Sequence, residues 1–448
     1  MPPDFPAAPA PPPTGPRWLV ARPGLAALLL SLSALAVYLP SGRYFQTGDN
    51  APAEALPRLI LEERRLDFTD EVELGEPLPY WLVVRNQRVV SFYPIVAGLL
   101  NLPVNALAKW RGADLKAGSL HFAHWTACLV VAASVGAIYL ALAAVCASGW
   151  AALLATLVYA FGTAAWSTGT QALWQHGPSL LFLGGALALL VRPGRWLPLA
   201  GLLLGLAVFN RPANLLFAAP LALFVLIQYR RSPRTWLAFL GLAAIPAAAM
   251  AWYSIEYHGS LLALGQGHGF SGRHAAHQTG FTGPLFAGLA GLLFSPARGL
   301  FVYSPVFLAA FPALLAGLRP SPERPWLRWL CLGALLDLLL FAKWTVWWGG
   351  YCFGYRMLTE LVPALVLLLG LLFDRVGALP RRRRRLAAAL LAPLAALSVW
   401  FNFLGARYFT AAWSEEKQVD KSPAALWDTS DTELARLQAR FRAEAFGP

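Results

Sequence analysis

The stretch SLHFAHWTACLVVAASVGAIYLALAAVCA, residues 119–147, decides the fold class because it contains no Asp, Glu, Lys or Arg. An α-helix of about 20 largely apolar residues is long enough to cross the ~30 Å hydrocarbon core of a bilayer. This stretch therefore predicts a transmembrane helix. Further apolar stretches lie on both sides of it, so we predict an all-α membrane protein that crosses the bilayer many times.

The composition of the chain agrees with this class. Of its 448 residues, 57% are hydrophobic and 13% are charged, whereas a soluble domain has about 25% charged residues. The four cysteines lie in or beside apolar stretches and show no disulfide framework. A soluble enzyme, a disulfide-rich secreted domain and a disordered chain are therefore excluded.

Eleven stretches are candidates for membrane-spanning helices. The first of them resembles a signal peptide in length, but no clear cleavage site follows it, so we interpret it as an anchor. One pair is separated by Asn210-Arg211-Pro212 and is also compatible with a broken hairpin that does not fully cross. The predicted spans are 24–40, 119–147, 150–168, 172–191, 196–209, 212–229, 235–256, 300–318, 326–347, 357–374 and 386–404.

The net charge of +13 is concentrated in short loops between these spans. With a cytosolic N-terminus, every short basic loop falls on one face, as the positive-inside rule requires. The densest cluster is Arg381 to Arg385, directly before an apolar stretch. Such a cluster is typical of a topology signal or of contact with anionic lipids, rather than of nucleic-acid binding. We therefore predict a multi-pass protein of the plasma (inner) membrane with no nucleic-acid partner.

The predicted layout has a membrane core with three segments on its outer face. Residues 51–66 and 95–110 have apolar positions at helical spacing, which predicts interfacial helices in the first outer loop. Asn86-Gln87, flanked by valines, predicts a small hairpin between them. The segments are a disordered cytosolic N-terminus (1–23), a core (24–404) and an outer C-terminal tail (405–448). The core includes the first outer loop (41–118) and a second outer loop (257–299).

Polar residues beside apolar stretches indicate a functional site, because such groups are costly near a bilayer. Eight of them map to outer span ends or outer loops and come from both halves of the chain. We expect them to converge on one outward-facing cavity. They are Asp49, His176, Arg211, Glu256, His258, Arg298, Lys343 and Arg356.

Asp49 and Asn50 follow the first predicted span. A carboxylate near the low-dielectric interface is suited to act as a general base. The alternative is a structural role, because Asp or Asn ahead of Ala51-Pro52 fits a helix N-cap. Asn50 is able to cap the helix while Asp49 stays free for catalysis.

Arg298 and Arg356 lie where predicted spans begin, each after a Gly- or Pro-containing break. Arginine at the interface binds a lipid phosphate bidentately, although it also snorkels to headgroups in ordinary spans. Glu360 follows Arg356 at the helical i,i+4 spacing, which predicts that it neutralises or orients that arginine.

Two other patterns point to weaker alternatives. His268, His274 and His277 lie among glycines, which favours a flexible lid over a divalent-metal site because their spacing matches no closed set of ligands. Asp337 and Lys343 in one predicted span are compatible with a proton or ion path. No glycine-rich phosphate loop follows a strand, so nucleotide binding has no support.

Several segments together resemble the integral-membrane GT-C class of glycosyltransferases, which includes protein mannosyltransferases and aminoarabinose transferases. These are a first span, an outer loop that opens with Gly48-Asp49, and Tyr93-Pro94 ahead of an interfacial helix. GLLFSPARGLFVYSP (291–305) and WWGGYCFGYRMLTELVP (347–363) look like segments of bacterial relatives of that class.

The resemblance implies a GT-C-like bundle and an inverting transfer of sugar from a polyprenyl phosphate, on the outer face of the membrane, to a lipid, glycan or protein. It implies that Asp49 is the catalytic base; members often have a second acidic neighbour, and Asn50 here leaves any metal dependence open. We expect Arg298, Arg356 and Arg211 to bind the donor phosphate. No cofactor is predicted, and a divalent metal stays an alternative. The expected substrate-pocket residues are Asn50, Tyr93, His176, His258, Tyr303, Trp347, Tyr355 and Glu360.

A lipid-linked-sugar flippase or another multi-pass transporter is the main alternative. It would use the same outer cavity and arginines, with Asp337 and Lys343 as a coupling pair. Against it, the two halves show no internal repeat, and the large first outer loop is more typical of an enzyme. A noncatalytic scaffold would leave the polar cluster without a role.

Overall fold

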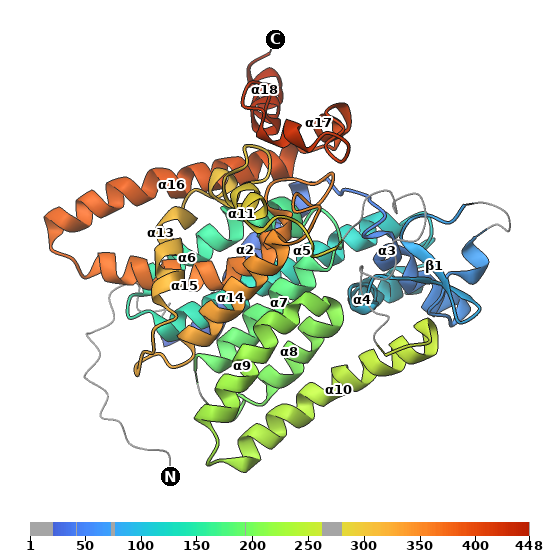
Figure 1. Cartoon of the computed structure of the whole chain (residues 1–448), viewed down its shortest axis with the longest axis horizontal. Coiled ribbons are helices and arrows are strands. Elements are labelled where there is room, and N and C mark those ends of the chain that lie inside the picture. Colours follow the sequence, from blue (N-terminus) through green and yellow to red (C-terminus); the bar gives the residue numbers. More distant parts are fainter. Residues whose placement is uncertain (1–20, 42, 73–76, 193, 262–279, 448) are drawn as a thin grey trace.

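The computed structural model describes residues 21–41, 43–72, 77–192, 194–261 and 280–447, and within these it is almost entirely helical (Figure 1). The predicted N-terminal tail, apart from its last residues, and the histidine-containing loop before Gly280 lie outside the described residues. The protein is therefore a polytopic, mostly helical membrane protein, as the sequence predicts.

Six helices within the described residues are long and apolar enough to cross a membrane. Three of them contain a change of helix type: the 3-10 helix η1 (Leu39–Ser41) follows α2, the π-helix η4 (Ala165–Gly169) follows α6, and the 3-10 helix η7 (Arg356–Leu361) precedes α15. The six are α2 with η1 (Pro23–Ser41), α5 (Ser119–Val145), α6 with η4 (Gly149–Gly169), α10 (Pro233–His258), η7 with α15 (Arg356–Gly377) and α16 (Arg381–Tyr408).

Shorter apolar helices complete the bundle, and two of them differ from the sequence prediction. The predicted span 300–318 is broken at Ser304, because a residue before proline disfavours the helical conformation. Helix α11 was not predicted and lies inside the predicted second outer loop, 257–299. The shorter helices are α7 (His176–Leu190), α8 (Leu199–Asn210), η5 (Pro212–Asn214), α9 (Leu215–Gln228), α11 (Leu285–Phe294), α12 (Leu300–Tyr303), α13 (Phe307–Ala316) and α14 (Leu327–Ala342).

The predicted break at Asn210-Arg211-Pro212 is confirmed. Arg211 has an extended backbone (φ −149°, ψ 108°), which ends α8 and allows Pro212 to begin η5. The amide of Asn214 then donates hydrogen bonds to Ser179 Oγ (2.8 Å) and to the Ala207 carbonyl (2.9 Å), so the turn is fixed to α7 as well as to α8. The side chain of Arg211 is thereby held at the end of α8.

Helix α5 packs against α2 and α7, and α8 packs against α10. Gly201 allows the last contact, since a Cβ there would lie 2.1 Å from the Phe239 carbonyl oxygen. Small residues bring helix backbones together in membranes, where the hydrophobic effect does not drive helix association. Figure 1 shows α10 on one flank of the bundle, reaching toward the first outer loop at its C-terminal end.

The segment 41–118, predicted as the first outer loop, contains the predicted helices and hairpin. The π-helix η2 (Leu59–Glu63) extends α3, and β1 pairs antiparallel with β2. Asn86 and Gln87 have positive φ (47° and 62°), the geometry of a tight two-residue hairpin turn. Asn86 also donates to the Glu256 carbonyl (2.8 Å), which ties the hairpin to α10. The elements are α3 (Ala51–Arg58), η2, η3 (Thr69–Glu71), β1 (Leu82–Arg85), β2 (Arg88–Ser91) and α4 (Val96–Trp110).

Helix α16 continues to Tyr408, beyond residue 404, where the predicted span ends. The first residues of the predicted C-terminal tail, 405–408, are therefore helical. The five-arginine run, predicted in a loop, forms the first turns of the same helix. The predicted amphipathic stretch near Leu434 is helix α18, and Figure 1 places it with α17 beside the end of α16. The remaining elements are α17 (Ala412–Glu416), η8 (Pro423–Trp427) and α18 (Glu433–Phe446).

Candidate active site

Asp49 is held by three side chains from distant parts of the chain. Its Oδ1 accepts hydrogen bonds from the hydroxyls of Tyr80 and Tyr93, both at 2.6 Å. Its Oδ2 accepts one from Arg356 Nη2 at 2.7 Å. The Asp49 and Arg356 side chains are 19% and 12% exposed. The carboxylate–guanidinium pair is therefore partly exposed.

Asn50 occupies the N-cap position of α3, but its side chain does not cap the helix. Its Oδ1 accepts hydrogen bonds from Thr47 N (2.7 Å) and Thr47 Oγ1 (3.0 Å), and its Nδ2 donates to Phe45 O (2.9 Å). The predicted capping role of Asn50 is therefore wrong, because its side chain fixes the preceding turn instead. That turn directs Asp49 toward the tyrosines.

The surroundings of Asp49 favour its ionised form. Burial raises the pKa of the carboxyl, but the charge of Arg356 and the hydrogen bonds from Tyr80 and Tyr93 outweigh this and hold the pKa below its usual value. Burial and the Asp49 charge raise the pKa of both tyrosines, so they remain protonated donors. The free site contains an ionised carboxylate.

Arg356 reaches Asp49 from the end of a sharply turned loop. Gly349 and Gly350 both have φ of 72°, a left-handed conformation that glycine adopts without strain. The guanidinium lies over the ring of Trp174, 4.9 Å from its centroid. Its Nε is buried and has no hydrogen-bond partner among the described residues. Nε and Nη2 form one edge of the guanidinium, so this edge contacts Asp49 at one end and has an unpaired N–H at the other.

The predicted pairing of Arg356 with Glu360 is wrong. The segment between them is the 3-10 helix η7, with a non-helical residue at Leu358 (φ −103°, ψ 17°), so the α-helical i,i+4 geometry is absent. Glu360 contacts His176 Nδ1 through Oε1 (3.0 Å) and accepts from Arg211 Nη1 through Oε2 (2.7 Å). We call Glu360, His176 and Arg211 the Glu360 cluster.

Arg298, predicted to bind a phosphate, is instead buried against the C-terminal segment. Its guanidinium contacts Glu433 Oε2 (3.1 Å), Ser414 Oγ (2.8 Å) and its neighbour's carbonyl, that of Ala297 (2.7 Å). Arg298 is only 1% exposed. These contacts attach the residues around α17 and α18 to the 291–305 segment and leave this arginine closed to a ligand.

Three of the expected pocket residues, Tyr303, Trp347 and Tyr355, contact other parts of the chain. Tyr303 lies edge-on to Phe353 (4.9 Å), and Trp347 packs near Trp427 (6.4 Å). The Tyr355 hydroxyl is bonded to Ser304 Oγ (2.7 Å). The structure gives these side chains packing contacts and does not bring them to Asp49.

The other polar candidates lie on α10 and α14. His258 packs edge-on to Tyr253 at the end of α10 (5.5 Å). Asp337 is fully buried, and neither of its carboxylate oxygens has a hydrogen-bond partner among the described residues. The backbone carbonyl of Lys343 accepts a hydrogen bond from Gly283 N (2.8 Å). The structure therefore does not form the expected Asp337–Lys343 pair.

Sequence reasoning missed Tyr80, Trp174 and Glu54. Glu54 accepts from Asn50 Nδ2 (2.8 Å) and Gln46 Nε2 (3.2 Å), and burial raises its pKa to about 7. The Asn50–Glu54 spacing of four residues at a helix start was a usable signal for this contact. Trp174 and Tyr80 gave no signal that distinguishes them from aromatic residues at any membrane interface.

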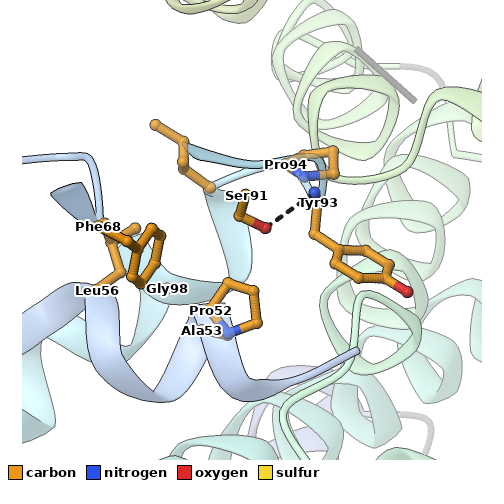
Figure 2. A pocket seen from close by; sticks show the side chains of 9 residues that line it. Pro52, Ala53, Leu56, Phe68, Ser91, Tyr93, Pro94 and Gly98 are labelled. Carbon is orange, nitrogen blue, oxygen red and sulfur yellow. Dashed lines mark hydrogen bonds between the residues drawn. The ribbon is translucent and has the colours of Figure 1, made fainter. Parts of the chain in front are cut away.

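A small pocket lies between α3, β2 and α4, and Tyr93 is one of its lining residues (Figure 2). It includes Pro52, Leu56, Phe68 and Gly98 in an apolar lining, and Ser91 Oγ accepts from the backbone N of Tyr93 (3.0 Å). Tyr93 thus contributes to the pocket wall while its hydroxyl reaches Asp49.

Metal-ligating side chains do not gather anywhere in the described part of the chain: no three His, Cys, Asp or Glu side chains lie close enough to hold an ion. His268, His274 and His277 lie outside the described residues, so the lid and metal interpretations of that loop stay predictions.

Comparisons with known proteins find similarity in structure but no match in sequence. No protein-family model matches the sequence, and no curated protein matches it. ArnT from Cupriavidus metallidurans, solved with undecaprenyl phosphate bound, is similar over 86% of this chain and 75% of that chain, with 14% identity and a TM-score of 0.50. The oligosaccharyltransferase AglB from Archaeoglobus fulgidus, solved with an inhibitory peptide and a dolichol-phosphate, is similar over 93% of this chain and 61% of that chain, with 14% identity and a TM-score of 0.48.

ArnT is a GT-C membrane glycosyltransferase, so the expected resemblance in structure to that class is confirmed. At this level of identity the likeness to ArnT shows the fold of the chain, which is GT-C-like.

Proposed function

We propose that this protein is a membrane glycosyltransferase that moves a sugar from a polyprenyl phosphate to a hydroxyl-bearing acceptor. The observation that carries the proposal is the contact between Asp49 and Arg356, a carboxylate beside a guanidinium whose Nε–H has no hydrogen-bond partner among the described residues. The GT-C-like fold, shared with a structure that holds undecaprenyl phosphate, supports this class of donor.

The proposed reaction is a single inverting displacement. The acceptor oxygen attacks the anomeric carbon and forms the new glycosidic bond, while the bond from that carbon to the phosphate oxygen breaks. Asp49 takes the proton of the acceptor hydroxyl, and the bonding electrons leave with the polyprenyl phosphate. Arg356 stabilises the charge that develops on the departing phosphate.

Arg356 connects donor binding to the basicity of Asp49. A phosphate that binds Nε and Nη2 together takes the edge on which Asp49 now lies. Asp49 then loses the nearest positive charge that keeps its pKa low. The donor therefore makes Asp49 a stronger base at the point where the acceptor proton must be removed.

The proposal places the N-terminus in the cytosol, eleven crossings as the sequence predicts, interfacial helices in the first outer loop, and the site on the outer face of the plasma membrane. There the polyprenyl chain stays in the hydrocarbon while the phosphate meets Arg356. Neither Arg298 nor Arg211 is assigned to the phosphate, since each is paired with a buried glutamate.

The test offers purified protein a panel of polyprenyl-phosphate sugars together with a crude acceptor lipid extract and measures release of polyprenyl phosphate. We expect one donor to be consumed in proportion to the protein present. If no donor is consumed while intact protein moves labelled lipid across liposome membranes, the flippase alternative replaces the transferase.

Removal of one tyrosine tests the ionisation of Asp49. Tyr93→Phe deletes a hydrogen bond to the charged carboxylate, so the pKa of Asp49 rises. A hydrogen bond to a charged group contributes about 1.5–3 kcal/mol, equivalent to about one to two pH units. The acid limb of the pH profile of kcat/KM should therefore move upward by that amount. An unmoved limb would show that Asp49 does not control it.

A further inference from the structure

The backbone of Arg356 is fixed by a short and irregular element. Arg356 is the first residue of η7, and its carbonyl accepts a hydrogen bond from Thr359 Oγ1 (2.7 Å). The non-helical residue Leu358 interrupts the element halfway. A 3-10 helix of this length has poor hydrogen-bond geometry by itself, so tertiary contacts must hold it.

Glu360 supplies such a contact from the same element. It is 1% exposed, and each of its carboxylate oxygens contacts a charged or polar side chain. Oε1 lies 3.0 Å from His176 Nδ1 at the start of α7, and Oε2 lies 2.7 Å from Arg211 Nη1 at the end of α8. Glu360 therefore connects η7 to two helices that lie far from it in sequence.

A second path leads from the residues just before α7 to the side chain of Arg356. Trp174, two residues before His176, lies under the Arg356 guanidinium. Its indole N–H donates to Thr47 Oγ1 (3.1 Å), and Thr47 belongs to the turn that carries Asp49. The contacts close a ring that runs from Arg356 along η7 to Glu360, across to His176, back to Trp174 and onto Arg356.

Arg211 keeps the Glu360 carboxylate in place. It is the cationic partner of Glu360, and its guanidinium lies over the ring of Phe341 (4.7 Å). Removal of the charge of a buried carboxylate leaves such an arginine without its counter-ion, which is costly. The cluster has no direct contact with Asp49 among the described residues, so any effect on transfer must pass through η7 and Trp174.

We propose that Glu360 is a positioning residue, which, held by His176 and Arg211, fixes the orientation of the Nε–Nη2 edge of Arg356 for the donor phosphate. This inference rests on the proposed function. Misplacement of a reacting group by about 1 Å costs on the order of 10²-fold in rate. A shift of η7 would therefore weaken catalysis although Arg356 itself is intact.

A double-mutant cycle tests the inference with Glu360→Gln, Arg356→Lys and the double variant, each assayed for kcat and donor KM. Glu360→Gln keeps the size of the side chain and removes its charge. We expect it to lower kcat/KM about 10–100-fold in the wild-type background. In the Arg356→Lys background we expect it to lower kcat/KM by less than about threefold. Residues that act through one another show such coupling, whereas independent ones do not.

Glu433→Gln is the matched control. It makes the same substitution at a buried glutamate that is also paired with an arginine, Arg298, outside η7. We expect its effect on kcat/KM to be the same in both backgrounds, whatever it does to the melting temperature. If Glu360→Gln lowers kcat/KM by the same factor in the wild-type and Arg356→Lys backgrounds, Glu360 has only a structural role and the inference is wrong. If Glu360→Gln does not fold, His176→Gln takes its place in the cycle.

Binding of polyprenyl phosphate in detergent, measured for the wild type and every variant, separates the two hypotheses. A wild type that neither transfers sugar nor binds polyprenyl phosphate contradicts the proposed function. A wild type that does both, with an additive cycle, contradicts only the positioning role of Glu360.

Discussion

Asp49→Asn is expected to lower kcat for sugar transfer by about 10²–10⁴-fold, the usual contribution of a positioned general base. The asparagine oxygen still accepts hydrogen bonds from Tyr80 and Tyr93, so the shape of the site is kept. Binding of polyprenyl phosphate is expected to become tighter, because Arg356 loses the carboxylate that occupies its edge. Both quantities are measured on the same purified variant, as release of polyprenyl phosphate and as direct binding.

Asp114→Asn is the control for this variant. Asp114 is an aspartate of the same outer loop, and its carboxylate accepts from the backbone N–H groups of Lys116 and Ala117. Its substitution should leave turnover and binding unchanged. Full turnover by Asp49→Asn would remove Asp49 from the mechanism, and a loss of phosphate binding would mean that Asp49 helps to build the donor site instead of competing for it.

Arg356→Ala is expected to lower kcat/KM for the donor by about 30–5,000-fold. Loss of one member of a buried, hydrogen-bonded charge pair costs about 2–5 kcal/mol. Donor KM should rise because the phosphate loses its ligand, and kcat should fall because the leaving group loses stabilisation. Arg356→Lys keeps the charge but not the planar edge, so it should retain part of the activity. Steady-state kinetics with the donor as the varied substrate measure both parameters.

Arg298→Ala distinguishes between the two arginines that the sequence favoured equally. It leaves Glu433 buried without its partner, which costs about 3–5 kcal/mol, so the melting temperature should fall clearly. Donor KM of the folded fraction should not change. If donor KM rises as strongly as in Arg356→Ala, the assignment of the phosphate to Arg356 alone is wrong.

Most of the fold could be predicted from apolar length alone. α5 and α10 are long uninterrupted apolar helices, and the break at Arg211 was visible in its proline neighbour. Helix α11 was not visible, because its ten residues are too few to count as a span. The break at Ser304 was hidden inside an apolar stretch, where hydropathy outweighed the local effect of Pro305.

The candidate site was predicted residue by residue but not as a set of contacts. Asp49 and Arg356 stood out as charges beside apolar segments, yet 307 positions separate them and no local pattern pairs them. Glu360 was predicted with the wrong partner, because the i,i+4 rule assumes an α-helix and η7 is not one. Tertiary contacts decided each of these outcomes.

The position of Arg356 at the end of a span ties the site to the thickness of the bilayer. The span Arg356–Gly377 has 22 residues, and 83% of its most apolar stretch is buried. The 16 residues of α15 rise about 1.5 Å each. The 6 residues of η7 rise about 2.0 Å each, so the whole span is about 36 Å long. A bilayer thicker than this must thin locally or draw the guanidinium toward the hydrocarbon, and packing on all sides leaves little freedom to tilt. If Arg356 binds the donor phosphate as proposed, the acyl-chain length of the surrounding lipids sets the depth at which that phosphate is bound.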